Sequence, residues 1–210
     1  MSEIEKTEQY VAVLRDKITL LLKGIGSIAI GDGSHFPYGW RKAAKGRTVW
    51  RLVEEIISQN LEKNAETLGL LDFSPAPSEV GVYDFSFRFQ SSPTIYVNIK
   101  SAVTGGRTNK DDISKAVALE KFFAENEGCQ LYVLTVQIGF SDAPLQISLD
   151  NCFVMPVAWL PDVYVNPSNN GNLQSSKYKN IDLATRREAS EFLAVLRDEM
   201  RVAQQKKKSK

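Results

Sequence analysis

Two stretches in the middle of the chain alternate between apolar and polar residues with a period of two, the pattern of a half-buried β-strand. Residues 80–90 carry an aromatic side chain at every second position, namely Tyr83, Phe85, Phe87 and Phe89. A Ser-Ser-Pro connection at residues 91–93 separates them from a second β-rich stretch at residues 94–101. The pattern predicts two adjacent antiparallel strands, a hairpin with one aromatic face.

Helical spacing of apolar residues predicts helices on both sides of this hairpin. The expected helices span residues 4–23, about 48–61, 111–126 and 184–204, and the expected further strands span 130–136 and 152–160. Segments rich in polar residues, Gly or Pro predict loops at 31–39, 75–77 and 166–176. In the first two helices the residues expected to be buried are Tyr10, Val13, Leu14, Ile18, Leu21, Leu22, Val49, Leu52, Val53, Ile56 and Ile57. The order of elements predicts an α/β fold, in which helices flank a central mixed β-sheet.

The composition fits one globular domain spanning residues 1–210, since 43% of the residues are hydrophobic and 24% are charged. No apolar run of about 18 residues exists, so we expect no transmembrane helix. The polar, acidic start lacks the features of a signal peptide. With two cysteines and one histidine, a zinc site or a His-based triad is poorly supported. We therefore expect Cys129 and Cys152 to be buried residues of a cytoplasmic protein.

The net charge of +1 hides two local groups of basic residues. The first group lies around the start of the second helix and consists of Arg41, Lys42, Lys45, Arg47 and Arg51. The second is a run of four lysines within residues 206–210. We expect residues 205–210 to form a solvated, disordered tail.

The hairpin carries a group of polar residues that can support phosphodiester hydrolysis. Asn98 and Lys100 share one face of their strand, and the neighbouring strand can bring Asp84 beside them. Oxygen ligands of this kind bind Mg²⁺, which activates water and stabilises charge on a phosphate. The lysine can orient or deprotonate the attacking water. The alternative is that all three are ordinary solvent-facing residues of a half-buried strand.

A Mg²⁺ site at the hairpin needs a second carboxylate beside Asp84, because the amide of Asn98 is a weaker cation ligand than a charged group. The helix before the hairpin supplies two candidates, Glu54 and Glu55, within an otherwise apolar stretch. Adjacent helical residues point about 100° apart, so one of them at most faces inward. Both glutamates could instead lie on the solvated side of the helix.

The run YDFSFRFQSSPTIYVNIKSAVTGGRTNK, residues 83–110, resembles the catalytic hairpin of PD-(D/E)xK restriction endonucleases, most closely their blunt-cutting EcoRV/SwaI branch. The order of elements over residues 45–195 is similar too. In that family a glutamate-bearing helix precedes the hairpin, a position that Glu54 matches here. This chain departs from the family pattern at Asn98, where an acidic residue is usual, and at Tyr83, where the motif has proline.

The resemblance implies a restriction-endonuclease-like fold and a Mg²⁺-dependent, site-specific deoxyribonuclease. Asp84 would be the principal metal ligand and Asn98 the second, with Lys100 as the catalytic lysine and Glu54 as a further catalytic residue. The expected substrate is double-stranded DNA with a short palindromic site, cut to blunt ends. A palindrome implies a homodimer in which each subunit reads one half-site. The N-terminal helix could serve as a dimer element or pack into the core.

Several polar and basic residues become candidates for DNA contacts in this context. Amide side chains can pair with adenine in the major groove, so the polar segment near the C-terminus is a candidate for base readout. Its residues are Asn169, Asn170, Asn172, Gln174 and Ser175. Phosphate contacts are expected from Arg107, Asn109, Lys110, Lys45 and Arg47. The polar segment could also be an ordinary surface loop, and Lys45 and Arg47 could merely solvate the start of a helix.

Two other functions remain open from the sequence. One is a repair or resolving nuclease of the same fold, which would read DNA structure rather than sequence. The other is a non-catalytic DNA-binding protein that has lost its metal site, a possibility that Asn98 keeps in view.

Overall fold

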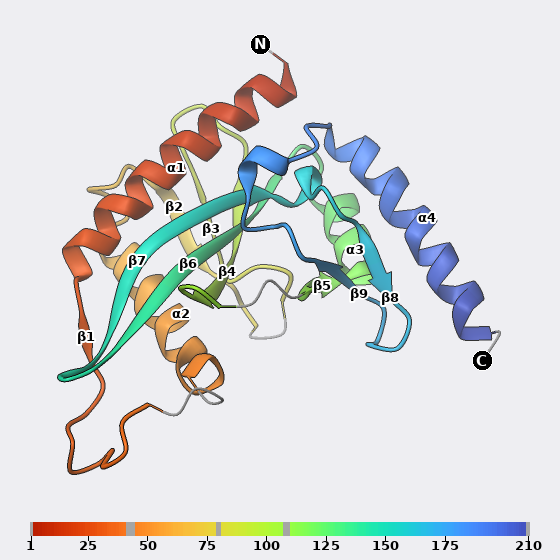
Figure 1. Ribbon diagram of the computed structural model, residues 1–210. Coiled ribbons are helices and arrows are strands. Elements are labelled where there is room, and N and C mark those ends of the chain that lie inside the picture. Colours follow the sequence, from red (N-terminus) through yellow and green to blue (C-terminus); the bar gives the residue numbers. More distant parts are fainter. Residues whose placement is uncertain (1, 41–44, 79–80, 107–109, 209–210) are drawn as a thin grey trace.

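A computed structural model describes residues 2–40, 45–78, 81–106 and 110–208, and the side chains of residues 45–48 lie outside this description. The structure is a mixed α/β fold with four α-helices and a strongly curled six-stranded sheet (Figure 1). The helices are α1 (Glu3–Ile25), α2 (Lys45–Lys63), α3 (Ala116–Glu125) and α4 (Ala189–Lys208), with 3₁₀ turns η1 (Val157–Trp159) and η2 (Ile181–Leu183).

The six-stranded sheet has the strand order β1-β7-β6-β4-β3-β2. Its central strands β4 and β6 run parallel, and the other described neighbours run antiparallel. A smaller sheet has the order β5-β9-β8. The strands are β1 (Ile28–Ala29), β2 (Leu71–Pro75), β3 (Phe85–Arg88), β4 (Ile95–Val103), β5 (Asp111–Lys115), β6 (Gln130–Asp142), β7 (Leu145–Pro156), β8 (Tyr164–Asn166) and β9 (Asn172–Ser175). The prediction of a central mixed sheet flanked by helices is therefore confirmed.

The large sheet is covered on both faces, because alternate residues of its strands enter two separate hydrophobic clusters. On β4, Ile95, Val97 and Ile99 join a cluster with α1 and α2. Tyr96, on the opposite face, packs against a second cluster built with α3, α4 and the small sheet. Figure 1 shows α1 running along β7 on one side and α4 beside β8 on the other. Polar residues on β4 consequently lie in the interior between these layers.

The first two helices form close to the predicted positions. The capping box of Ser2 and Glu5 starts α1, and Gly26, with a φ of 69°, ends it, as glycine readily adopts this conformation. Two predicted core positions are wrong, since Val13 and Leu52 are 41% and 44% exposed. A helix that packs on a sheet buries only one stripe, and both residues fall beside that stripe.

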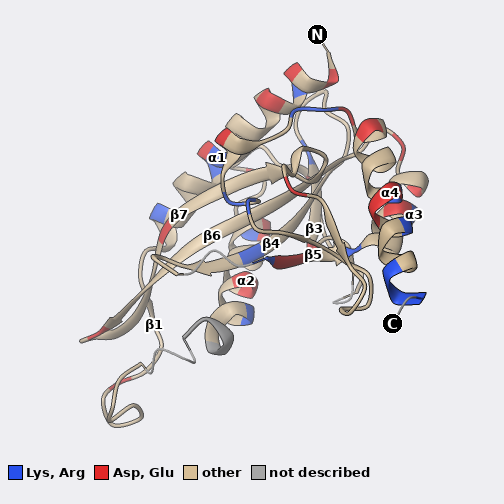
Figure 2. Ribbon diagram, turned by 45° about the vertical axis from the view of Figure 1, so that its right-hand side comes forward, with Lys and Arg blue, Asp and Glu red and all other residues tan. Residues whose placement is uncertain are grey.

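Three predicted elements differ from the structure. The helix expected from residue 111 is replaced over its first five residues by β5, and only Ala116–Glu125 is helical. The loop expected at 166–176 is largely the β8–β9 hairpin. Near the C-terminus, α4 begins at Ala189 rather than 184 and continues through Lys208, so the described part of the expected disordered tail is helical. The lysines of this last turn form the basic end of the chain in Figure 2.

The β3–β4 hairpin is confirmed, although β3 is shorter than residues 80–90. Phe85, Phe87 and Phe89 are buried on the side of α1 and α2. Tyr83 leaves this aromatic face and packs against the other cluster, where its ring meets Tyr96 with centroids 4.7 Å apart. β3 thus begins at Phe85, and Asp84 lies immediately before it.

Two further expectations can be compared with the described residues. Cys129 and Cys152 are both free and buried, as predicted. Within the described ranges, the apolar stretches of the helices are too short or too charged to span a bilayer.

The packing of α1 predicts a large difference between two leucines of the same helix. Leu14 is fully buried against the sheet, whereas Leu20 is 66% exposed. We expect Leu14→Ala to lower the free energy of unfolding by about 2–5 kcal/mol, because it leaves a cavity in the core. Leu20→Ala should change it by no more than about 0.5 kcal/mol. Urea unfolding of both variants measures the difference, and equal losses would contradict this placement of α1.

Candidate active site

Asp84 lies immediately before β3 and is fixed by the neighbouring strand β4. Its backbone N–H donates to the carbonyl of Val97 at 2.8 Å, and its carboxylate accepts a hydrogen bond from the backbone N–H of Ile99 at 2.6 Å. Burial raises the pKa of the Asp84 carboxyl, while the Ile99 amide and the Lys100 ammonium act in the opposite direction. The residue as a whole is open to solvent on one side, so an ion can reach its carboxylate.

Glu54 reaches the same region from α2. It is half-buried, whereas the adjacent Glu55 is exposed and accepts a hydrogen bond from Gln59 at 2.7 Å. The structure thus turns Glu54 toward the sheet and Glu55 outward. Burial raises the pKa of Glu54 from 4.5 to about 7; Lys100 opposes this shift and Asp84 adds to it. Lys100 and Arg51 therefore only partly offset the loss of water around the Glu54 carboxylate.

Lys100 projects from β4 among four carboxylates. Burial lowers the pKa of its ammonium group, and Glu54, Asp84, Asp111 and Asp112 all act to raise it. A half-buried ammonium keeps its charge only when anions or hydrogen bonds compensate for lost water. The lysine and its carboxylates therefore form one electrostatic unit, drawn from α2, β4, β5 and the residue that precedes β3.

An open cleft of about 540 Å³ lies between α2 and the start of β3. The guanidinium of Arg51 partly offsets the negative charge of four carboxylates that line the cleft. These carboxylates are those of Glu54, Glu55, Glu62 and Asp84. An acidic cleft repels the phosphates of DNA unless a cation neutralises it. The lining therefore favours a cation over a bare anion.

Asn98 lies on β4 between Val97 and Ile99, facing away from α2. Its Nδ2 donates to the carbonyl of Val82 at 3.3 Å. Within the described part of the chain its buried Oδ1 has no hydrogen-bond partner. A buried acceptor without a partner costs about 1–3 kcal/mol, so a hydrogen bond or a cation at this oxygen would stabilise the structure.

The donor set fits a hard cation such as Mg²⁺ with few protein ligands. No group of three or more His, Cys, Asp or Glu side chains with metal-binding placement occurs in the described ranges. Magnesium, however, commonly uses one or two carboxylates and completes its octahedron with water and substrate oxygens. Asp84 and Glu54 can supply the carboxylates, and the unpartnered oxygen of Asn98 is a further oxygen ligand of the predicted set.

The predicted base-reading residues lie on and around β9, but they differ in availability. Asn172 and Gln174 are on the strand, and Asn169 and Asn170 form the turn before it. Ser175 is fully buried and its hydroxyl donates to Asp162. In this conformation Ser175 offers no surface for the DNA contact predicted for it.

The predicted phosphate contacts are only partly described. Lys110 is exposed, with its Nζ 4.1 Å from the centroid of the Tyr164 ring. Arg107 and Asn109 lie outside the described residues, as does Lys42, and Lys45 and Arg47 are described only as backbone of the first turn of α2.

Asp111 and Asp112 are the residues near the site that sequence reasoning missed. Asp111 accepts hydrogen bonds from the hydroxyl of Tyr178 at 2.6 Å and from Nζ of Lys179 at 3.0 Å. Asp112 accepts from three amide side chains of the β8–β9 hairpin. The sequence shows two adjacent acidic residues after a basic segment, which could have indicated a functional role. Because residues 111–126 were expected to form a helix, the strand β5 that carries these two residues was not predicted.

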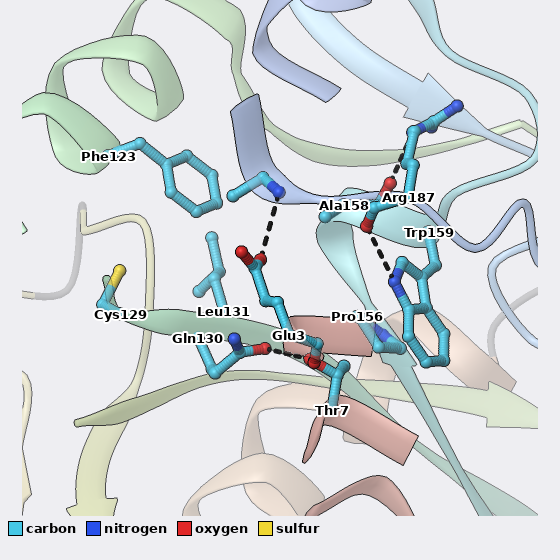
Figure 3. Close-up of a pocket in the computed structure, with 11 residues that line it drawn as sticks. Glu3, Thr7, Phe123, Cys129, Gln130, Leu131, Pro156, Ala158, Trp159 and Arg187 are labelled. Carbon is cyan, nitrogen blue, oxygen red and sulfur yellow. Dashed lines mark hydrogen bonds between the residues drawn. The ribbon is translucent and has the colours of Figure 1, made fainter. Parts of the chain in front are cut away.

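A second, much smaller pocket lies away from this cleft, where the N-terminal ends of α1 and α4 meet the start of β6 (Figure 3). Its polar groups satisfy one another: the backbone N–H of Ala189 donates to Glu3 and Thr7 donates to Gln130. Nε1 of Trp159 donates to the carbonyl of Arg187, whose own side chain donates to the carbonyl of Ala158. This pocket joins elements of the fold, and burial raises the pKa of its Cys129 thiol to about 12, which makes the thiol a poor nucleophile.

Comparison with known protein families gives no matching family model, and comparison with curated proteins gives no significant match.

The raised pKa of Glu54 predicts a pH-dependent stability. Because the folded state holds this proton more tightly than the unfolded chain, ionisation destabilises the fold as pH rises from about 4.5 through about 7. We expect Glu54→Gln to be more stable than the unmodified protein by about 1–2 kcal/mol near pH 8, a value reduced for partial solvent exposure. Near pH 4.5 the advantage should vanish.

Urea unfolding between pH 4.5 and 8.5 measures this difference. Glu55→Gln is the matched control, since Glu55 is the next residue of the helix and is exposed. A stability difference for Glu54→Gln that stays constant across this range would show that Glu54 is not held in a desolvated site.

Proposed function

We propose that this chain is a Mg²⁺-dependent type II restriction endonuclease that hydrolyses double-stranded DNA at a short palindromic site. The observation that supports it best is the electrostatic interaction of Lys100 with Glu54 and Asp84, because separate parts of the fold supply the three groups. Surface residues of a half-buried strand would not need a carboxylate from a facing helix. The similarity of residues 83–110 to the PD-(D/E)xK hairpin agrees with this arrangement.

The proposed roles follow from the position of each group. Asp84 and Glu54 would hold Mg²⁺, with the Asn98 oxygen as an additional ligand. When bound, the ion supplies a more acidic water molecule and stabilises negative charge on the phosphate. Lys100 orients the attacking water or neutralises a phosphate oxygen. The Ile99 amide fixes the Asp84 carboxylate, so that it needs little reorganisation.

The proposed substrate requires a second subunit. Two-fold symmetric DNA is cut on both strands by a two-fold symmetric dimer, with one site for each strand. Blunt-end cleavage follows from the resemblance to the EcoRV/SwaI branch. The β8–β9 hairpin carries the amide groups that would approach base edges, and it adjoins the site through β5.

Cleavage of phage λ DNA tests the function directly. With Mg²⁺ at about 10 mM, a level suited to weak oxygen-ligand sites, we expect discrete bands that disappear with EDTA. Lys100→Ala should lower the rate by about 100-fold or more, since it removes charge stabilisation at the phosphate. Lys121→Ala is the control, because Lys121 is an exposed lysine of α3 paired with Glu125.

The other outcomes separate the alternatives. A smear without discrete bands, lost in Lys100→Ala, would indicate a nuclease that does not read sequence. Intact DNA together with salt-sensitive binding would indicate a non-catalytic DNA-binding protein. A smear that Lys100→Ala leaves unchanged would exclude this site as the source of cleavage.

Metal binding can be measured without DNA. We expect Mn²⁺ to bind the protein, and Asp84→Asn to weaken this binding at least about tenfold because it removes a charged oxygen ligand. Asp72→Asn is the control, since Asp72 is an exposed aspartate paired with Arg88 on the adjacent strands. Electron paramagnetic resonance of free Mn²⁺ gives the affinities, and equal affinities for the two variants would remove Asp84 from the metal site.

A further inference from the structure

Asp112 is the hub of a polar cluster on the small sheet. Its carboxylate accepts from Nδ2 of Asn169 at 3.0 and 2.8 Å, from Nδ2 of Asn172 at 3.0 Å and from Nε2 of Gln174 at 2.7 Å. Asn172 and Gln174 are two positions apart on β9 and so project from the same face. Asn169 joins them from the turn, which Asn170 and Gly171 form with positive φ angles of 51° and 71°.

The charge of Asp112 decides how these amides are oriented. An ionised carboxylate only accepts hydrogen bonds, so each amide that contacts it must present its NH₂ group. The amide carbonyl oxygens therefore point away from Asp112. Oε1 of Gln174 accepts from Nδ2 of Asn166 at 3.2 Å, whereas the Oδ1 atoms of Asn169 and Asn172 make no hydrogen bond with any described residue.

This orientation changes what the amides can recognise. Bidentate pairing with adenine needs both the NH₂ group and the carbonyl oxygen of one side chain. The NH₂ group of Asn169 lies close to both oxygens of Asp112 and is committed to it. What remains available at Asn169 is a hydrogen-bond acceptor, which suits the exocyclic amino groups of cytosine or adenine in the major groove.

We propose that Asp112 is a specificity-determining residue: together with Gln174 it fixes the amides of Asn169 and Asn172, so that the β8–β9 hairpin presents their carbonyl oxygens as acceptors to base amino groups. Asp112 acts through these side chains and is a positioning residue rather than a catalytic one. The inference rests on the proposed function, because it assumes that the hairpin faces DNA.

The charge of Asp112 is expected to affect sequence discrimination and non-specific DNA binding in opposite directions. Asp112 is exposed and negatively charged, so it repels the phosphate backbone and weakens binding to DNA of any sequence. Removing its charge should therefore preserve or strengthen non-specific binding while it weakens discrimination between sequences. Damage to the fold would weaken both.

The experiment selects bound duplexes from a random pool with Ca²⁺ in place of Mg²⁺, so that cleavage does not interfere. The unmodified chain is compared with Asp112→Asn and with Asp198→Asn, an identical change at an exposed aspartate of α4. Affinities are then measured for the selected duplex, for duplexes with one changed base pair, and for random duplex. For the unmodified chain we expect about 10- to 100-fold weaker binding per changed base pair within the site.

We expect Asp112→Asn to lose about tenfold or more of this discrimination at the base pairs that the amides contact, with random duplex bound at least as tightly. Asp198→Asn should behave as the unmodified chain. If Asp112→Asn selects the same sequence with the same discrimination, the inference is overturned and the proposed function stands. If the unmodified chain selects no sequence, the proposed function itself fails and the inference fails with it.

A second variant covers the case in which Asp112→Asn does not fold. Asn172→Ala removes a single amide and leaves Asp112 held by Asn169 and Gln174. We expect it to lose discrimination at one base pair of each half-site only. Unchanged discrimination at every position would overturn the inference.

Discussion

The burial of β4 on both faces is the constraint on which the candidate site depends. One face packs on α1 and α2, and the other lies under α3, α4 and the small sheet. Asn98 and Lys100 fall on the second face, so folding removes much of their water. A charged or amide group in such a place destabilises the fold unless other groups compensate. The carboxylates gathered around Lys100 are this compensation.

The attraction between Lys100 and its carboxylates does not fully offset the water that these groups lose on folding. Lys100 has a lowered pKa despite four carboxylates, while Glu54 and Asp84 have raised pKa values despite the lysine. Burial therefore outweighs attraction for all three groups. In the proposed nuclease, Mg²⁺ would supply positive charge that Lys100 alone does not provide to these carboxylates. The buried Oδ1 of Asn98, which has no partner among the described residues, would be a further oxygen ligand.

The sequence predicts the elements whose pattern is local. It does not predict those whose structure depends on pairing with residues far away in the chain. The alternation around Asp84 and Lys100 gives the hairpin and its polar face, because strand periodicity is a local property. The helical spacing around residue 54 gives α2, but which glutamate faces inward depends on how α2 lies on the sheet. Residues 111–115 contain no strong strand signal and become β5 only by pairing with β9, some sixty residues later. The same pairing turns an expected loop into a hairpin and buries Ser175.

The pairing of β5 with β9 also brings the proposed base-reading hairpin next to the proposed catalytic residues. Asp111 and Asp112 are consecutive residues of β5, and both act on the pKa of Lys100. Asp111 is held by Tyr178 and Lys179, whereas Asp112 holds the amides of the hairpin. In the proposed nuclease, β5 would therefore carry one carboxylate that orients the base-reading amides and a neighbouring one that faces the surroundings of Lys100. The pairing of β5 with β9 would fix the hairpin relative to the catalytic residues, because both depend on the same short strand.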